Sequence, residues 1–207
     1  KRVWVDNVEE VNSAYDDYSP CVSMDGSMLM FTSKKDNGRT SKSGYDWDHD
    51  IYVSYLDDGK FSKPKNMGDA INTPENETSG MLSYDGTKLL IFKDVGGHFD
   101  IFESSLKGAK WSPMVSFSPQ INTKDNQTFG SFNANEKKIY YINDRKKGDA
   151  NYGTDIYVSQ RMDKATRKYE FPNTAGKEVN TKFNEGSVYM HPNGDLMFFS
   201  SEGHNSM

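Results

Sequence analysis

The chain has 207 residues, a formal net charge of −5 and 27% charged residues. This is long enough for a domain with a real core, and the composition excludes a disordered chain. Acidic and basic residues are interspersed, so no basic stripe is available to neutralise phosphates and nucleic acid is not an expected partner. No apolar run approaches the roughly 20 residues that span a bilayer, so we expect the chain itself not to cross a membrane.

A short signature recurs four times along the chain. It reads Val-Asn-Ser, Ile-Asn-Thr, Ile-Asn-Thr and Val-Asn-Thr around Asn12, Asn72, Asn122 and Asn180. Thirteen residues after each asparagine lies a turn dipeptide, which is Asp-Gly twice, then Asn-Glu, then Asn-Gly. Asp-Gly and Asn-Gly between apolar runs are strong signals for a tight β-hairpin. The chain is therefore predicted to repeat one β-unit.

Each unit carries the marks of four strands. A first strand lies between the signature and the turn, and a second, apolar strand follows the turn. The words Asp-Ile-aromatic-x-Ser that begin at Asp50, Asp100 and Asp155 predict a third strand. An aromatic residue placed 11 residues before the next signature asparagine marks a fourth strand at Phe61, Trp111 and Tyr169. Repeats of four short strands are typical of propeller blades.

The predicted fold class is therefore all-β, a β-propeller of four-stranded antiparallel blades in a single domain over residues 1–207. Residues 1–11 are expected to be the outer strand of the closing blade. Blades follow at 12–71, 72–121 and 122–179, with half a blade at 180–207. About three and a half blades are thus expected, as part of a ring of roughly six to eight. A closed four-bladed ring is the alternative.

The Asp-Gly turns and the Asp-Ile-Tyr words resemble WD40-like, TolB-type blades. The fuller patterns at 11–20 and 200–207 resemble the propellers of Bacteroidetes envelope proteins, which often sit between tetratricopeptide-type helices and an OmpA-like peptidoglycan-binding domain. The resemblance implies a periplasmic protein associated with the outer membrane, in secretion machinery of type IX or in gliding machinery. It implies envelope proteins as partners, peptidoglycan as an indirect one, and a longer chain of which this is an N-terminal part.

No catalytic, cofactor or metal site is predicted. The sequence Asp46-Trp-Asp48-His-Asp50 alternates acids as a calcium loop does, but Ile51 stands where that loop requires glycine. The aspartate of each Asp-Ile word is instead expected to make a structural hydrogen bond at the start of the third strand. The single cysteine, Cys21, is expected to be a small buried residue.

One polar position recurs five residues after each signature asparagine, at Asp17, Glu77, Gln127 and Glu185. Its side chain is predicted either to bind backbone of the adjacent blade or to form an acidic rim that attracts a cationic ligand. Propeller geometry places the loops 34–49 and 144–154 on the same face. The first loop carries Arg39, Tyr45 and Trp47, residue types that anchor protein interfaces. This face is the predicted partner-binding face.

Together these patterns predict a non-catalytic scaffolding propeller of a bacterial envelope assembly. It would link a secretion or motility complex to peptidoglycan through a separate OmpA-like domain. Two alternatives stay open. One is a lid or channel domain of a hydrolase of the prolyl oligopeptidase type, and the other is a propeller that binds a small ligand or cation.

Overall fold

The computed structural model describes residues 4–36, 38, 48–144, 153–163 and 167–205. Within these ranges the regular structure consists of β-strands in four antiparallel sheets, with no helix. Arg39, Tyr45 and Trp47 lie outside the described residues. The prediction of an all-β chain built from repeated antiparallel sheets is confirmed.

Three of the sheets share one plan, in which three long strands are followed by two short ones. The first sheet contains β1 (Asp17–Val22), β2 (Met28–Ser33), β3 (Asp50–Asp57), β4 (Lys60–Phe61) and β5 (Lys65–Asn66). The second contains β6 (Glu77–Leu82), β7 (Lys88–Asp94), β8 (Phe99–Lys107), β9 (Lys110–Trp111) and β10 (Val115–Ser116). The third contains β11 (Gln127–Phe132), β12 (Lys138–Asp144), β13 (Thr154–Asp163), β14 (Lys168–Tyr169) and β15 (Asn173–Thr174). The last sheet has β16 (Glu185–Met190) and β17 (Met197–Ser201).

The predicted hairpin turns join the first two strands of each sheet. Gly26, Gly86 and Gly194 have positive φ angles of 72°, 68° and 81°, which glycine adopts without strain. Glu136 occupies the same turn position in the third sheet with a φ of 53°. Its amide still donates to the carbonyl of Asn133 at 2.8 Å, so the third turn forms although it lacks glycine.

The fourth strand of each blade is split in two. In the first sheet, β4 pairs with the end of β3 and β5 pairs with its middle, at Tyr52 and Val53. Pro64, Pro113 and Pro172 stand between the two short pieces. A proline has no amide hydrogen to give to the ladder, which accounts for the interruption. The predicted aromatic markers therefore lie in the first piece only.

The expected outer strand at residues 1–11 is not a strand where the structure describes it. Residues 4–8 have no regular structure, and Trp4 and Val5 are 79% and 89% exposed. By their distance from Asn12, residues 5 and 6 correspond to β5, β10 and β15, each of which pairs with the third strand of its own sheet. The described residues supply no third strand for residues 5 and 6, so no ladder forms.

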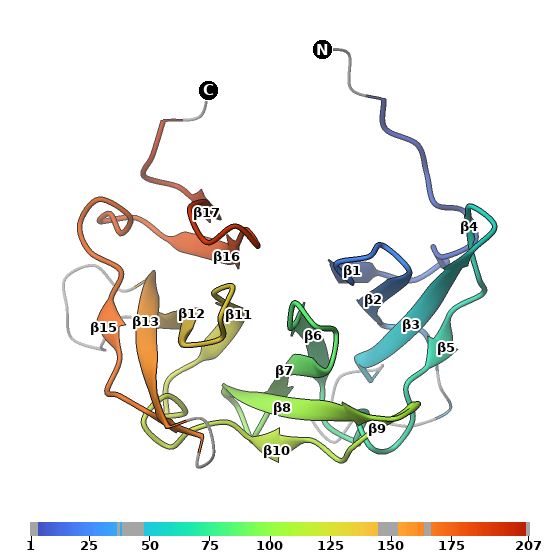
Figure 1. Ribbon diagram of the computed structural model, residues 1–207, viewed down its shortest axis with the longest axis horizontal. Coiled ribbons are helices and arrows are strands. Elements are labelled where there is room, and N and C mark those ends of the chain that lie inside the picture. The colour runs from blue at the N-terminus through green and yellow to red at the C-terminus, as the bar shows by residue number, and fades with distance from the viewer. Residues whose placement is uncertain (1–3, 37, 39–47, 145–152, 164–166, 206–207) are drawn as a thin grey trace.

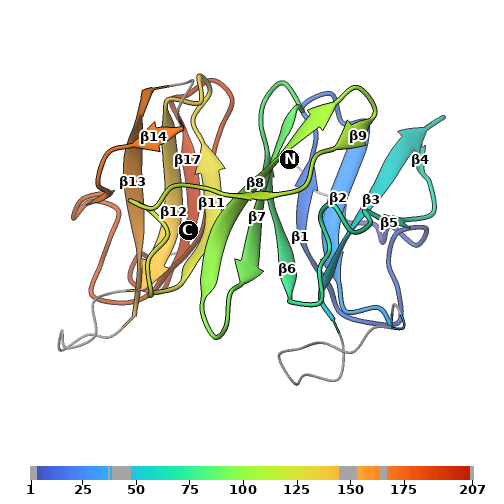
Figure 2. The same ribbon diagram turned by 90° about the horizontal axis from the view of Figure 1, so that it is seen from below.

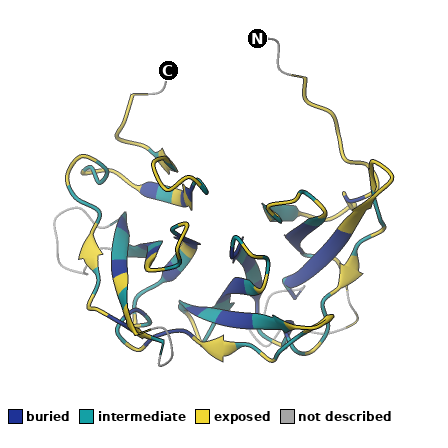
Figure 3. Cartoon of the chain, viewed as in Figure 1, coloured by how far each residue is buried: buried dark blue, intermediate teal, exposed yellow. Residues whose placement is uncertain are grey.

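The four sheets stand side by side around an arc, with β1, β6, β11 and β16 innermost and both termini at the open side (Figures 1 and 2). The core lies between neighbouring sheets. Met30 and Ile51 of the first sheet pack with Leu89 of the second, and Phe92 of the second packs with Tyr141 of the third. Buried residues concentrate in the long strands of each sheet (Figure 3). The sheets are therefore arranged as blades of a propeller.

Candidate binding surface

The recurring polar position opens each innermost strand, as predicted. Glu77, Gln127 and Glu185 are 0% exposed and Asp17 is half-buried. A fully buried side chain cannot touch a partner, so three of the four residues form no exposed rim. Only Asp17 retains partial access to solvent.

The side chain at this position closes the connection that leads into its strand. Glu77 Oε2 accepts a hydrogen bond from the Thr73 amide at 2.9 Å, and the Thr73 hydroxyl donates to Glu77 Oε1. Gln127 reproduces the pattern, since its Oε1 accepts from the Thr123 amide at 3.0 Å and its Nε2 donates to Thr123 Oγ1 at 2.9 Å. The partner lies four residues earlier in the same connection, not in the adjacent blade as expected.

The first and last copies also bind the residue four positions earlier. Asp17 Oδ2 accepts from the Ser13 amide at 2.6 Å. Glu185 Oε1 accepts from the Thr181 hydroxyl at 2.8 Å and from the Ser201 hydroxyl at 3.0 Å. Each acid or amide therefore ties the start of its strand to the connection that leads into it, which is a structural role.

Burial sets the charge state of Glu77. Removal from water raises the pKa of its carboxyl to about 8, and the nearby Asp48 carboxylate acts in the same direction. The two Thr73 donors and the Lys93 ammonium, whose Nζ lies 3.8 Å from Glu77 Oε1, oppose the rise. Glu77 is therefore largely protonated at neutral pH and would contribute little negative charge to the predicted acidic rim.

The signature asparagines link each connection to the preceding sheet. Asn72 Oδ1 accepts from the Ile51 amide at 2.8 Å, and Asn72 Nδ2 donates to the Ile51 carbonyl at 3.0 Å. Asn122 binds Ile101 in the same way at 3.0 and 2.8 Å. Asn180 binds Ile156 at 2.9 and 2.8 Å. The isoleucine of every Asp-Ile word is thus held by both its main-chain groups.

A second asparagine, four residues after the first, completes the link. Its side-chain oxygen accepts from the amide two residues before the isoleucine. The pairs are Asn76 with His49 at 3.2 Å, Asn126 with Phe99 at 3.0 Å and Asn184 with Thr154 at 3.2 Å. We call each pair of asparagines a junction clamp. In the sequence the first asparagine served only to mark the repeat. The second was not singled out, although it recurs four residues later at Asn76, Asn126 and Asn184.

The predicted hydrogen bond at the start of the third strand is present in the first sheet. Asn66 Nδ2 donates to Asp50 Oδ2 at 2.6 Å, and Asn72 Nδ2 donates in turn to Asn66 Oδ1 at 2.9 Å. The aspartate of the Asp-Ile word therefore joins the same polar network as the clamp. Across the described ranges, no three His, Cys, Asp or Glu side chains gather closely enough to hold a metal ion.

The predicted loops begin beside the clamps. The Lys34 amide donates to the Asp16 carbonyl at 3.1 Å, and the Asp144 amide donates to the Asn126 carbonyl at 3.3 Å. Each second strand thus ends next to the start of its innermost strand, which places both loop origins on one face. Arg39, Tyr45 and Trp47 belong to the first loop but lie outside the described residues, so their role stays a prediction.

A cavity of about 630 Å³ lies on the inner side of the arc and was not foreseen from the sequence. Its wall is mostly apolar and includes Tyr18, Cys21, Phe129 and Tyr189 from the innermost strands β1, β11 and β16. Burial raises the pKa of the Cys21 thiol to about 11, and the Leu82 amide donates to its Sγ at 3.1 Å.

Tyr84 connects three sheets at one end of this cavity. Its hydroxyl donates to the Met190 carbonyl at 2.6 Å and lies 3.2 Å from the Phe132 carbonyl. Tyr84 follows β6, whereas Phe132 and Met190 end β11 and β16. The cavity wall is therefore held by a polar contact between the second sheet and the third and fourth sheets.

Comparison with known proteins gives a fold. No family model and no curated protein matches the sequence. Among solved structures, TolB from Acinetobacter baumannii superposes with a TM-score of 0.53 and 18% identity, over 86% of this chain and 36% of that one. A putative TolB from Agrobacterium tumefaciens gives 0.56 and 17% identity, over 91% of this chain and 55% of that one. The chain has a TolB-like β-propeller fold.

The same fold occurs in a larger hydrolase. A puromycin hydrolase mutant complexed with PGG gives a TM-score of 0.55 with 12% identity, over 91% of this chain and 25% of that one. The propeller described above thus spans between a quarter and about half the length of these three structures. At such identities the likeness shows the fold alone. None of the described residues lies in a helix that could cross a membrane.

Proposed function

We propose that the chain is a non-catalytic, protein-binding propeller of a bacterial cell-envelope assembly. The observation that carries the proposal is the use of the repeated polar residues. The acid or amide at the start of each innermost strand and both asparagines of each clamp are engaged in hydrogen bonds that hold the blades. The variable loops 34–49 and 144–154 begin on one face of the arc, which we call the loop-bearing face. Contacts with a partner can vary there without disturbing the core.

The proposal places the chain in the periplasm, associated with the outer membrane. The TolB-like fold and the resemblance of residues 11–20 and 200–207 to envelope propellers support this location. In such an assembly the propeller would bind components of a secretion or motility complex, and a separate OmpA-like domain would reach peptidoglycan. The partners would dock on the loop-bearing face through Arg39, Tyr45 and Trp47, with Asp17 at its inner edge.

The experiment is capture of cross-linked partners from an envelope fraction with the 207-residue chain as bait. Joint replacement of Arg39, Tyr45 and Trp47 by alanine is expected to abolish capture of the specific partners. The matched control is Tyr55→Ala, which removes an aromatic side chain that is 47% exposed at the other end of β3, beside the first hairpin turn. Partners retained by the triple variant, or lost equally from the control, would contradict the proposal.

A second candidate function is favoured by the apolar cavity of about 630 Å³. Small-ligand pockets are concave and mainly apolar with a few polar groups, and this cavity fits that description. In this alternative the cavity binds a small ligand. In a larger hydrolase, the propeller would instead admit substrate to the catalytic domain. Thermal melting with calcium, sugars and short peptides is the test. A rise of the melting temperature that Ser187→Trp abolishes, by filling the cavity, would favour it over the scaffold.

A further inference from the structure

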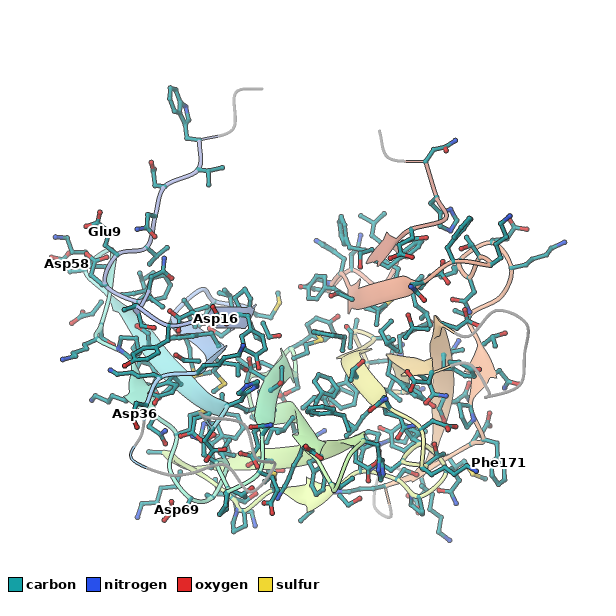
Figure 4. The ribbon with its side chains drawn as sticks, turned by 180° about the vertical axis from the view of Figure 1, so that it is seen from behind. Glu9, Asp16, Asp36, Asp58, Asp69 and Phe171 are labelled. Carbon is teal, nitrogen blue, oxygen red and sulfur yellow. The ribbon has the colours of Figure 1, made fainter. Side chains whose placement is uncertain are left out.

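The first blade carries the counterpart of a junction clamp, Asn12 and Asp16, and no strand among the described residues occupies it. By repeat position, Asn12 corresponds to the asparagines that bind Ile51, Ile101 and Ile156, and Asp16 corresponds to Asn76. Asn12 is exposed, and its Nδ2 donates to Asn7 Oδ1 rather than to an isoleucine carbonyl. Among the described residues none donates to Asn12 Oδ1. Asp16 lies at the same open end of the arc (Figure 4) and pairs with the Lys34 ammonium at 2.8 Å.

The apolar residues beside this clamp form half of a blade junction. Val11, Leu29, Phe31 and Tyr52 pack together with Phe61, and all five come from the first sheet and the segment that leads into it. We call Val11, Val22, Leu29, Phe31 and Tyr52 the N-terminal face. It contains no residue from a second sheet.

The equivalent face of the third sheet shows what completes such a junction. Ile121, Ile139 and Tyr141 stand at the repeat positions of Val11, Leu29 and Phe31. They pack against Leu90, Phe92 and Ile101 of the preceding sheet in one buried cluster. Phe132 is 0% exposed there, whereas its counterpart Val22 is 53% exposed. The N-terminal face therefore continues the pattern of an interface that three other junctions share.

We propose that the N-terminal face and its clamp bind the third strand of a further blade of this repeat type, an extended segment that carries an Asp-Ile-aromatic word. Asn12 Oδ1 and Nδ2 would hold the amide and carbonyl of its isoleucine. The Asp16 carboxylate would accept from the amide two residues earlier, as Asn76 does from His49. A groove of about 180 Å³ beside Val11, Phe31 and Tyr52 is available to the strand's apolar side chains. This site adjoins the loop-bearing face at Asp16 and Asp17 but uses none of Arg39, Tyr45 and Trp47.

The occupant follows from which groups the clamp binds. In the three occupied clamps the bonds to the Asp-Ile segment go to its main-chain amides and carbonyls, whereas other bonds of the same asparagines go to side chains elsewhere. The occupant must therefore leave the amide and the carbonyl of one residue free on the same side of its backbone, and an extended segment does so. The chain's own three words are already held, so none of them is available to Asn12 without unfolding a blade.

The test is an NMR titration of the isotopically labelled 207-residue chain with a capped peptide of residues 154–160, Thr-Asp-Ile-Tyr-Val-Ser-Gln. We expect saturable shifts of the Asn12 side-chain amide and of Val11. Asn12→Ala should weaken binding by about tenfold or more, because two hydrogen bonds are lost and each contributes roughly a factor of three to ten. The same peptide with Ile156→Pro should not bind, since proline has no amide hydrogen.

The control variant is Asn7→Ala, which frees the Asn12 amide from its present partner and should bind the peptide at least as tightly. Both substitutions lie at exposed positions, and circular dichroism would establish that the variants fold. Absence of saturable shifts would overturn the proposal. So would an unchanged affinity of Asn12→Ala for the peptide, shifts that map to β17 instead, or dimerisation through the N-terminal face in light scattering.

Discussion

Replacement of Glu77 by glutamine tests the structural role of the buried acids. In the folded chain the pKa of Glu77 is raised from 4.5 to about 8 by burial. The folded chain therefore keeps a proton that the unfolded chain releases above about pH 4.5. This contribution to stability is full below pH 4.5, falls as the pH rises, and is lost above about pH 8. Glu77→Gln has no such proton and should lack this dependence.

The magnitude follows from the two pKa values. The rise from 4.5 to about 8 sets a ceiling of about 5 kcal/mol for the loss of stability between pH 4.5 and pH 9. Water entry and side-chain rearrangement around the charged carboxylate reduce that ceiling, and we expect a change of about 1–3 kcal/mol. Glutamine fits the site, because Gln127 makes the equivalent bonds to Thr123 while fully buried.

The assay is urea unfolding of the wild-type chain and Glu77→Gln at pH 5, 7 and 9. The free energy of unfolding of the variant minus that of wild type should increase by about 1–3 kcal/mol from pH 5 to pH 9. Other groups titrate alike in both chains and cancel. Gln127→Glu is the reciprocal variant and should introduce a similar fall with rising pH. Parallel curves for wild type and Glu77→Gln would refute the argument.

Three further substitutions or modifications test the blade contacts. Asn72→Ala should lower the free energy of unfolding by about 1–3 kcal/mol, because it leaves the buried Ile51 amide without an acceptor, while the Met67 amide still donates to the Ile51 carbonyl. The exposed Asn12→Ala should cost less than about 0.5 kcal/mol, and equal urea midpoints for the two variants would contradict this difference. Tyr84→Phe should cost about 1–2 kcal/mol and speed amide hydrogen exchange in β16 but not in β3, and uniform exchange would argue against the contact. The Cys21 thiol, whose pKa burial raises to about 11, should react with a disulfide reagent at pH 8 about 100-fold more slowly in the folded chain than in guanidinium, and equal rates would exclude that environment.

The hairpins and the repeat were predictable because their chemistry is local. Asp25-Gly26 and Asp85-Gly86 specify tight turns through a few neighbouring atoms, and the apolar strands flank them directly. The split of the fourth strand was also within reach, since the prolines between its two pieces are visible in the sequence. A single aromatic residue was expected to mark one fourth strand in each blade, where the chain forms two short strands.

The polar contacts between blades were not predictable in the same way. Asn72 binds a strand 21 residues earlier, and a one-dimensional pattern does not specify that pairing. For Glu77 a clue was present, because a serine or threonine stands four residues before every member of its position, at Ser13, Thr73, Thr123 and Thr181. The cavity was missed because its wall combines the four innermost strands with Phe92 of β7, and each of these strands looks ordinary in the sequence.

The junction clamp has a consequence for how such chains change over time. Because it recognises the amide and carbonyl of one residue, it is indifferent to most side chains of the neighbouring strand. Gene duplication or recombination can then add or exchange a blade without changing the clamp, as long as the apolar side chains between the two sheets stay complementary. The loops of each copy are free to diverge independently, so the number of blades and the surface they present can evolve separately.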